Sequence, residues 1–253
     1  MLLKNTLHTL LTLIVTLFSV QVFGQVVNFM QYGVENGLPQ SQVNTITQDD
    51  EGNLWVGTVS GLASWNGIEF TSYGINDSVA EEWITSSFKA SNGDVYFGHW
   101  GGSITRYDAV NKLFESIHIE RFNSYQEVSD FEEDTLHNKI LFSTQGSGLF
   151  VYDTETHKVQ RYEIASSIEG SRLITCLHID ADERMWIGTE NAGVFIIDLN
   201  TFYNDSNATV KHFNATNGLS NDQISEIMEY DNEMWFGTKR GANYIKMDEL
   251  EGF

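Results

Sequence analysis

The sequence has 253 residues and is strongly acidic, with 35 aspartate and glutamate residues against 14 lysine and arginine residues and a formal net charge of −21. Nucleic-acid affinity depends mainly on cations that contact phosphates, so this charge argues against nucleic acid and anionic membrane surfaces as partners. The single cysteine, Cys176, excludes an intramolecular disulfide, and the folded core must therefore supply the stability by itself.

Residues 1–24 are predicted to be a secretory signal peptide. Lys4 provides an early positive charge, an apolar run extends from Leu10 to Val20, and Gly24 places a small residue at the cleavage point. An apolar stretch of about 7–15 residues is typical of a cleaved leader, whereas a retained membrane anchor needs about 20 apolar residues. We therefore expect residues 25–253 to form the mature, exported domain.

An internal repeat indicates the architecture. A four-residue pattern recurs five times, and the first residues of successive copies are 41, 45, 45 and 49 positions apart. A period of about 40–50 residues is typical of propeller blades. The five copies are Trp55-Val56-Gly57-Thr58, Tyr96-Phe97-Gly98-His99, Leu141-Phe142-Ser143-Thr144, Trp186-Ile187-Gly188-Thr189 and Trp235-Phe236-Gly237-Thr238.

Each repeat is interpreted as four short strands. In the first unit, residues 43–47 alternate between apolar and polar side chains, which is the pattern of a half-buried strand. Residues 49–53 supply the acidic, asparagine and glycine residues of a turn, and Asn66-Gly67 is a strong hairpin signal. The four predicted strands of this unit are residues 43–47, 54–58, 62–65 and 69–73.

The predicted fold is therefore all-β, a β-propeller of four-stranded blades with about five blades in this chain. The large aromatic residue of each copy is expected to fill the wedge between neighbouring sheets. The glycine two residues later is expected to let neighbouring backbone approach closely. These residues are interpreted as packing residues and not as ligand contacts.

The two ends of the repeat region leave two alternatives open. Phe29-Met30-Gln31-Tyr32 has the same Phe-x-x-Tyr form as Phe70-Thr71-Ser72-Tyr73, and the last unit has no clear fourth strand after Ile245. Either the N-terminal segment completes the final blade and closes a five-bladed ring, which removes open sheet edges, or the chain is a fragment of a larger, seven-bladed propeller. We favour the fragment.

Motifs of the first unit give a more specific assignment. The residues concerned are Glu35-Asn36-Gly37-Leu38-Pro39, Val43, Asp49, Gly52, Trp55-Val56-Gly57-Thr58, Gly61-Leu62 and Asn66-Gly67, and Asn217-Gly218-Leu219-Ser220-Asn221 repeats the opening before the fifth unit. Together they resemble the two-component regulator propeller repeat. The resemblance extends from Phe29 to Ile245 and is weakest in the second and third units.

This resemblance implies the periplasmic sensor region of a bacterial histidine kinase or hybrid two-component sensor. Such regions are usually followed by a membrane helix and a histidine kinase core, and neither is found in these 253 residues. A kinase module would therefore act in cis, from sequence absent from this chain, or in trans. Sensors of this kind usually form dimers, so the resemblance also implies a dimer.

The sequence contains none of the common catalytic motifs, such as Gly-x-Ser-x-Gly, His-Glu-x-x-His or a phosphate-binding loop. We predict no catalytic residues, no cofactor and no metal. Cys176 and His178 are two residues apart, but a zinc site would need at least a third ligand, so both are interpreted as packed structural residues. His99 replaces the threonine of the repeat and either faces the binding end or bonds to a neighbouring backbone group.

The binding surface is predicted from the loops. In a four-stranded blade, the second-to-third and fourth-to-first connections emerge on the same face, around the central channel, and loops on a rigid scaffold commonly carry function. Trp83 or Trp100 is expected to stack on a neutral ligand, and a sugar would suit because it offers both hydroxyl groups and an apolar face. The candidate ligand-binding residues are Gln42, Glu82, Trp83, His99, Trp100, Gln126, Arg172, Asn191, Asp222, Lys239 and Arg240.

The sequence thus predicts a periplasmic or otherwise exported sensor propeller that binds a small molecule, an oligosaccharide or a protein partner. Two alternatives stay open at this point. The first is a non-enzymatic scaffold that docks proteins on its acidic face, and the second is a propeller enzyme similar to streptogramin lyase.

Overall fold

The computed structural model describes residues 28–117, 119, 126–162, 164, 168–203 and 209–250. The predicted signal peptide lies outside these residues. Residues 1–32 and 33–253 form separate units, and every assigned strand belongs to the second. In the described part of the chain, no helix is both long enough and apolar enough to cross a membrane.

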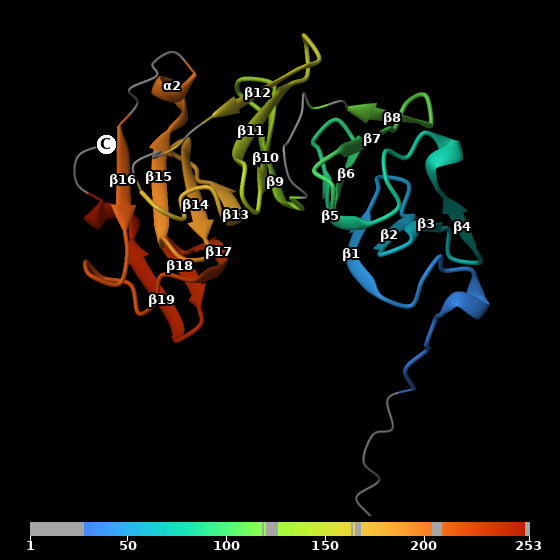
Figure 1. Cartoon of the computed structure of the whole chain (residues 1–253), viewed down its shortest axis with the longest axis horizontal. Coiled ribbons are helices and arrows are strands. Elements are labelled where there is room, and N and C mark those ends of the chain that lie inside the picture. The colour runs from blue at the N-terminus through green and yellow to red at the C-terminus, as the bar shows by residue number, and fades with distance from the viewer. Residues whose placement is uncertain are drawn as a thin grey trace, which may run out of the picture. The chain divides into compact units, whose positions relative to one another are not determined.

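Five antiparallel sheets follow one another along the chain, and we call them blades 1 to 5 (Figure 1). In each sheet the strands are hydrogen-bonded in chain order. The strands of blades 1 and 2 are β1 (Val43–Gln48), β2 (Leu54–Thr58), β3 (Gly61–Trp65), β4 (Phe70–Tyr73), β5 (Ile84–Lys89), β6 (Val95–His99), β7 (Ile104–Asp108) and β8 (Leu113–Ile117). Those of blades 3 and 4 are β9 (Val128–Asp134), β10 (Lys139–Thr144), β11 (Gly148–Asp153), β12 (Lys158–Tyr162), β13 (Ile174–Ile179), β14 (Arg184–Thr189), β15 (Val194–Asp198) and β16 (Val210–Phe213).

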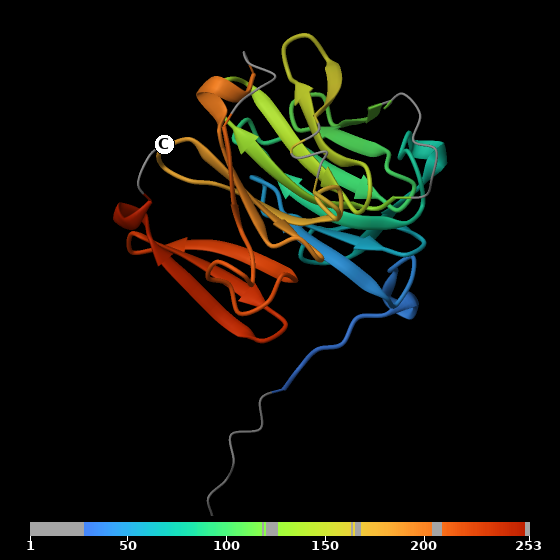
Figure 2. The same ribbon diagram turned by 60° about the vertical axis from the view of Figure 1, so that its left-hand side comes forward.

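Blade 5 has three strands among the described residues (Figure 2). They are β17 (Ile224–Tyr230), β18 (Glu233–Thr238) and β19 (Gly241–Lys246). The helical elements are short: η1 (Val34–Asn36), η2 (Ile75–Asp77), α2 (Leu199–Phe202) and η3 (Met247–Glu249). The all-β propeller of four-stranded blades is thus confirmed. Residues 29–32 do not form the expected strand. The described residues 28–32 have no regular secondary structure.

The first strands of successive blades lie against one another, in the order β1, β5, β9, β13 and β17. In blades 1 to 4, a polar side chain near the start of the first strand donates a hydrogen bond to a backbone carbonyl of the next blade. The four bonds are Asn44 Nδ2 to Ile84 O at 2.7 Å, Thr85 Oγ1 to Val128 O at 2.8 Å, Ser129 Oγ to Ile174 O at 2.7 Å and Thr175 Oγ1 to Ile224 O at 2.8 Å. We call this series the interblade ladder.

The repeated tryptophan and glycine pack between blades as predicted. Trp55 is buried and contacts the Tyr107 ring of blade 2 at a centroid distance of 4.6 Å, and Trp186 is buried against Phe236 of blade 5. A Cβ added to Gly57 would lie 2.6 Å from the Ile84 side chain of the next blade. The glycine is therefore required by the close approach of two blades.

A carboxylate at the turn between the first two strands holds the indole of each tryptophan. Asp49 accepts a hydrogen bond from Trp55 Nε1 at 3.0 Å, and Asp180 accepts one from Trp186 Nε1 at 2.7 Å. In blade 5 the acceptor for Trp235 Nε1 is Glu233, at 3.0 Å. A buried N–H group without a hydrogen-bond partner would destabilise the fold. The turn residue therefore stabilises the tryptophan in its position between the blades.

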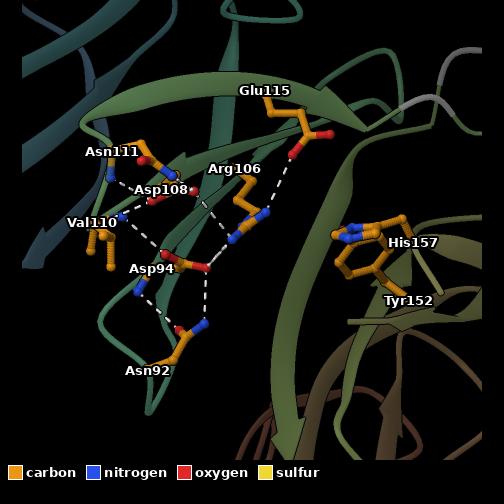
Figure 3. Close-up of polar contacts among 10 residues, drawn as sticks. Asn92, Asp94, Arg106, Asp108, Val110, Asn111, Glu115, Tyr152 and His157 are labelled. Carbon is orange, nitrogen blue, oxygen red and sulfur yellow. Dashed lines mark hydrogen bonds and ion pairs between the residues drawn. The ribbon is translucent and has the colours of Figure 1, made fainter. Parts of the chain in front are cut away.

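Blade 2 lacks both the tryptophan and the usual aspartate, and a different polar contact replaces them (Figure 3). Asp94 is buried and accepts hydrogen bonds from Arg106 Nε at 2.8 Å and from the Ala109 backbone N–H at 2.9 Å. Arg106 also forms ion pairs with Asp108 and Glu115. The carboxylate has moved from the start of the turn to its end, and the degenerate repeat keeps the four-stranded fold.

Candidate functional site

The starts of the first strands of blades 1, 2 and 3 surround an open hollow of about 490 Å³. Its walls come from the connections that lead into β1, β5 and β9, together with the hairpin between β6 and β7. This is the loop class predicted to surround the channel. The lining residues are Gln42, Val43, Asn44, Trp83, Thr85, Trp100 and Glu127.

Trp83 and Trp100 form the largest aromatic surface of the hollow. Their rings are stacked, with centroids 4.5 Å apart and an interplanar angle of 15°. Trp83 is 39% exposed and Trp100 is 38% exposed. Large aromatic side chains usually bury most of their surface, so a stacked pair that keeps this much surface in solvent is available to a ligand.

Local contacts hold the pair in place. The Trp100 backbone N–H donates to the Trp83 carbonyl at 3.1 Å. The Glu81 carboxylate accepts the Gly101 backbone N–H at 2.9 Å and the Ser103 hydroxyl at 2.5 Å. These bonds join the segment that enters β5 to the hairpin between β6 and β7, so both rings are carried by a fixed frame.

Four of the five remaining lining residues are polar, Val43 is apolar, and one of the polar residues is an acid. Burial, and secondarily the charge of Glu190, raise the pKa of Glu127 above its ordinary value. The side chains of Asn44 and Thr85 belong to the interblade ladder. The hollow therefore combines an aromatic face with amide and carboxyl groups, an arrangement that suits a ligand with hydroxyl groups and an apolar side.

Three of the predicted residues, Gln42, Trp83 and Trp100, lie together at this hollow. The others belong to the predicted loops but do not line it. Gln126 accepts a hydrogen bond from the Ser147 hydroxyl, and Asp222 accepts one from the Ala215 backbone N–H. The candidates with exposed side chains outside the hollow are Glu82, Arg172, Asn191, Lys239 and Arg240.

His99 is fully buried and cannot contact a ligand in this structure, so it is removed from the set of candidates. Its Nε2 atom lies 2.8 Å from the Thr105 hydroxyl. Burial lowers the pKa of His99 to about 4, so the ring is neutral at pH 7. The expectation that this histidine bonds to neighbouring groups of the protein describes its role: besides the Thr105 hydroxyl, backbone groups of Glu81 and Trp83 interact with its ring.

Charged groups gather on the first strands of blades 3, 4 and 5. His178 lies 3.5 Å from the Glu132 carboxylate through Nδ1 and 3.7 Å from the Glu229 carboxylate through Nε2. Burial lowers the pKa of His178, but the two carboxylates outweigh burial and leave it above its ordinary value. Burial also raises the pKa of the Cys176 thiol to about 12. Among the described residues, no histidine, cysteine and acid cluster has the arrangement of a metal site.

Four lining residues, Val43, Asn44, Thr85 and Glu127, are outside the set of candidate ligand-binding residues, although Glu127 belongs to one of the loops predicted to surround the channel. The sequence contained a signal for two of them, Asn44 and Thr85. Asn44 and Thr85 each follow the first apolar residue of a predicted strand, and Ser129, Thr175 and Ser225 follow equivalent residues in the other units. A polar residue repeated at this point of every blade marks the side chains at the blade boundary.

Comparison with solved structures finds extensive similarity to bacterial sensor domains. The extracellular domain of the hybrid two-component system BT3049 from B. thetaiotaomicron matches with a TM-score of 0.69, 25% identity, 87% of this chain and 30% of that chain. The corresponding domain of BT4673 from the same organism gives a TM-score of 0.67, 23% identity, 81% of this chain and 27% of that chain. The chain thus spans less than a third of the length of these neighbours.

Virginiamycin B lyase from Staphylococcus aureus is also similar, with a TM-score of 0.60, 14% identity, and coverage of 81% of this chain and 70% of the lyase. At this identity the similarity concerns the fold alone. A comparison with curated protein sequences finds no match. The family model described as "two component regulator propeller" matches residues 37–60 and 169–191. These two segments of the chain therefore match the two-component regulator propeller repeat, as the sequence predicts.

Proposed function

We propose that this chain is the extracytoplasmic, ligand-sensing propeller of a two-component-type signalling protein. The observation that carries the proposal is the stacked pair of Trp83 and Trp100, which is half exposed at a hollow between three blades. The similarity to extracellular domains of hybrid two-component systems supports the sensory role. In this proposal the domain is exported, and a histidine kinase module in cis or in trans receives the signal.

The ligand class that suits the hollow is a neutral sugar or oligosaccharide. The outer faces of the tryptophan rings offer an apolar surface for the C–H face of a sugar ring, and Gln42 and Glu127 offer polar groups at the same hollow. An anionic ligand is disfavoured, because the chain carries a net charge of −21 and Glu127 and Glu190 lie close enough to influence each other.

The proposed role is binding without catalysis. The buried Cys176 has a raised thiol pKa and the buried His99 has a lowered pKa, so neither provides an exposed nucleophile or base. Ligand binding would then change the contacts that hold the loops of blades 1, 2 and 3, and this change would be the signal that the domain passes on. Because these blades are linked through Asn44 and Thr85, a ligand in the hollow would act on two blade boundaries at once.

The test is calorimetric titration of the purified chain with a panel of neutral oligosaccharides. We expect saturable binding of at least one member, and we expect Trp100→Ala to weaken that binding about tenfold or more, which corresponds to about 1.4 kcal/mol. Tyr230→Ala is the matched control, because Tyr230 is an exposed aromatic residue of β17 outside the hollow. No binding across the panel, or equal losses in the two variants, would remove the sugar proposal.

A further inference from the structure

Residues of β19, the last strand of blade 5, line a small apolar pocket. Figure 1 labels this strand. The volume of the pocket is about 130 Å³. A dry apolar cavity of about 150 Å³ accommodates a benzene ring, so the pocket has the size of an aromatic side chain. It is lined by Phe213, Asn217, Gly218, Leu219, Phe236, Asn243, Tyr244 and Ile245.

The register of the strands shows which part of blade 1 corresponds to this pocket. Trp55 pairs with Ser64 in blade 1, and Trp235 pairs with Tyr244 in blade 5. The NGL motif before each blade aligns Asn36-Gly37-Leu38 with Asn217-Gly218-Leu219. The pocket residues Gly218, Leu219, Phe236, Asn243 and Ile245 thus correspond to Gly37, Leu38, Val56, Ala63 and Trp65 of blade 1.

In blade 1 this position is filled by Phe70, the first residue of the fourth strand. Phe70 packs on the cluster of Leu38, Val56 and Ala63, and its ring lies 4.6 Å from that of Trp65. Its Cβ would lie 3.1 Å from a Cβ added to Gly37, whereas a Cβ added to Gly218 meets no atom within 4 Å. The pocket of blade 5 therefore has the residues that surround Phe70 in blade 1.

The backbone beside the pocket also corresponds to the backbone beside Phe70 in blade 1. Within the described residues, β19 pairs with β18 alone, so its other edge carries backbone N–H and C=O groups without a neighbouring strand. In blade 1 the equivalent edge of β3 pairs with β4, with Trp65 opposite Phe70 and Leu62 opposite Tyr73. An open edge next to a side-chain pocket is the arrangement that binds peptides by strand addition.

We infer that the edge of β19 and its pocket bind an extended segment of Phe-x-x-Tyr pattern, which adds antiparallel as the fourth strand of blade 5. The phenylalanine lies in the pocket opposite Ile245. The tyrosine lies opposite Ala242, on the face of Trp235, as Tyr73 lies 5.6 Å from Trp55. The third residue faces the Gly218 carbonyl, as the Ser72 hydroxyl donates to the Gly37 carbonyl at 2.9 Å. This site is separate from the hollow at Trp83 and Trp100.

The test uses the full chain and a capped peptide with the sequence of residues 69–74, Glu-Phe-Thr-Ser-Tyr-Gly, labelled for fluorescence polarisation. We expect saturable binding with one peptide per chain. Replacing the peptide phenylalanine by alanine should weaken binding at least about tenfold, because burial of a phenylalanine ring supplies much of the affinity. Equal binding of the two peptides, or no saturable binding either to this chain or to its Phe29→Ala, Tyr32→Ala variant, would overturn the proposal.

Asn243→Phe places a ring in the pocket and should abolish peptide binding. Met228→Phe adds the same ring at an exposed position of β17, outside the pocket, and should leave binding unchanged. Thermal unfolding of both variants checks that blade 5 is folded. A second protein, with Phe29→Ala and Tyr32→Ala, is titrated in parallel as a control for the Phe-x-x-Tyr pattern that residues 29–32 share with the peptide. Peptide binding by this variant alone would still support the site and would identify residues 29–32 as a competitor, and light scattering would show whether a second copy supplies it.

Discussion

Blades 4 and 5 carry nearly the same motif, and their tryptophans have different surroundings. Trp186 is fully buried because the Phe236 ring of the next blade lies 5.7 Å away. Trp235 is only partly buried, and its ring contact among the described residues is with Tyr244 of its own sheet, at 4.9 Å. Since the motifs match and the neighbours differ, the following blade and not the motif decides how deeply the aromatic residue is buried.

The largest expected effect on stability comes from removing the tryptophan rings of Trp186 and Trp235. Trp186→Ala should lower the free energy of unfolding by about 3–5 kcal/mol, the usual cost of deleting a buried large aromatic side chain, and it also removes a hydrogen bond to Asp180. Trp235→Ala should cost roughly 1–2 kcal/mol, because less apolar surface is lost from the interior. Urea unfolding followed by circular dichroism measures both, and equal losses would show that the motif alone sets the contribution.

A smaller effect is expected at the glycines of the same two motifs. A Cβ added to Gly188 would lie 2.5 Å from Cys176 Sγ and 2.8 Å from the Ile224 side chain of the next blade. In blade 5 the nearest atom to a Cβ on Gly237 is the Ser225 hydroxyl oxygen, at 3.1 Å. Overpacking of this kind costs about 1–3 kcal/mol, so Gly188→Ala should be destabilising by that amount and Gly237→Ala by less than about 1 kcal/mol. Thermal unfolding of the Gly188→Ala and Gly237→Ala variants measures the two losses of stability. Equal losses would show that close packing between blades does not determine the cost of the added methyl group.

The smallest effect is a dependence on pH at the boundary of blades 3, 4 and 5. Because the pKa of His178 is raised in the folded protein, its ion pairs with Glu132 and Glu229 stabilise the fold fully below the unfolded-state pKa of about 6.5. This stabilisation is lost as the pH rises through the higher folded-state pKa. His178→Gln should therefore be more destabilising at pH 5.5 than at pH 8.5 in urea unfolding. A loss that does not change with pH would assign His178 a packing role only.

Much of the fold followed from local patterns. The first unit was predicted at residues 43–47, 54–58, 62–65 and 69–73, and the observed strands differ by one residue at three of their ends. Alternating side chains and the Asn66-Gly67 turn are local signals, so they are readable without a structure. The prediction at residues 29–32 rested on the same kind of pattern, but a strand forms only where a partner strand is present, and a local pattern does not contain that information.

The second unit shows what local patterns cannot provide. Its polar centre is built from Asp94, in the turn before β6, and Arg106, on β7, and no repeated sequence motif predicts their contact (Figure 3). For the candidate site, loop position alone selected Trp83 and Trp100 correctly as exposed residues. Their mutual stacking, and the burial of His99, depend on how two loops of one blade meet in space.

The interblade ladder has a consequence for how such a protein changes in evolution. Each of its bonds needs one specific side chain in the donating blade and only a backbone carbonyl in the accepting blade, and every residue type provides that carbonyl. This hydrogen bond between neighbours therefore does not depend on the accepting side chain, unlike the packing of Trp186 on Phe236. Gene duplication or loss of a complete unit would leave the new neighbours able to form the same bond, so arrays of different lengths can arise from one unit without compensating mutations for this bond at the new junction.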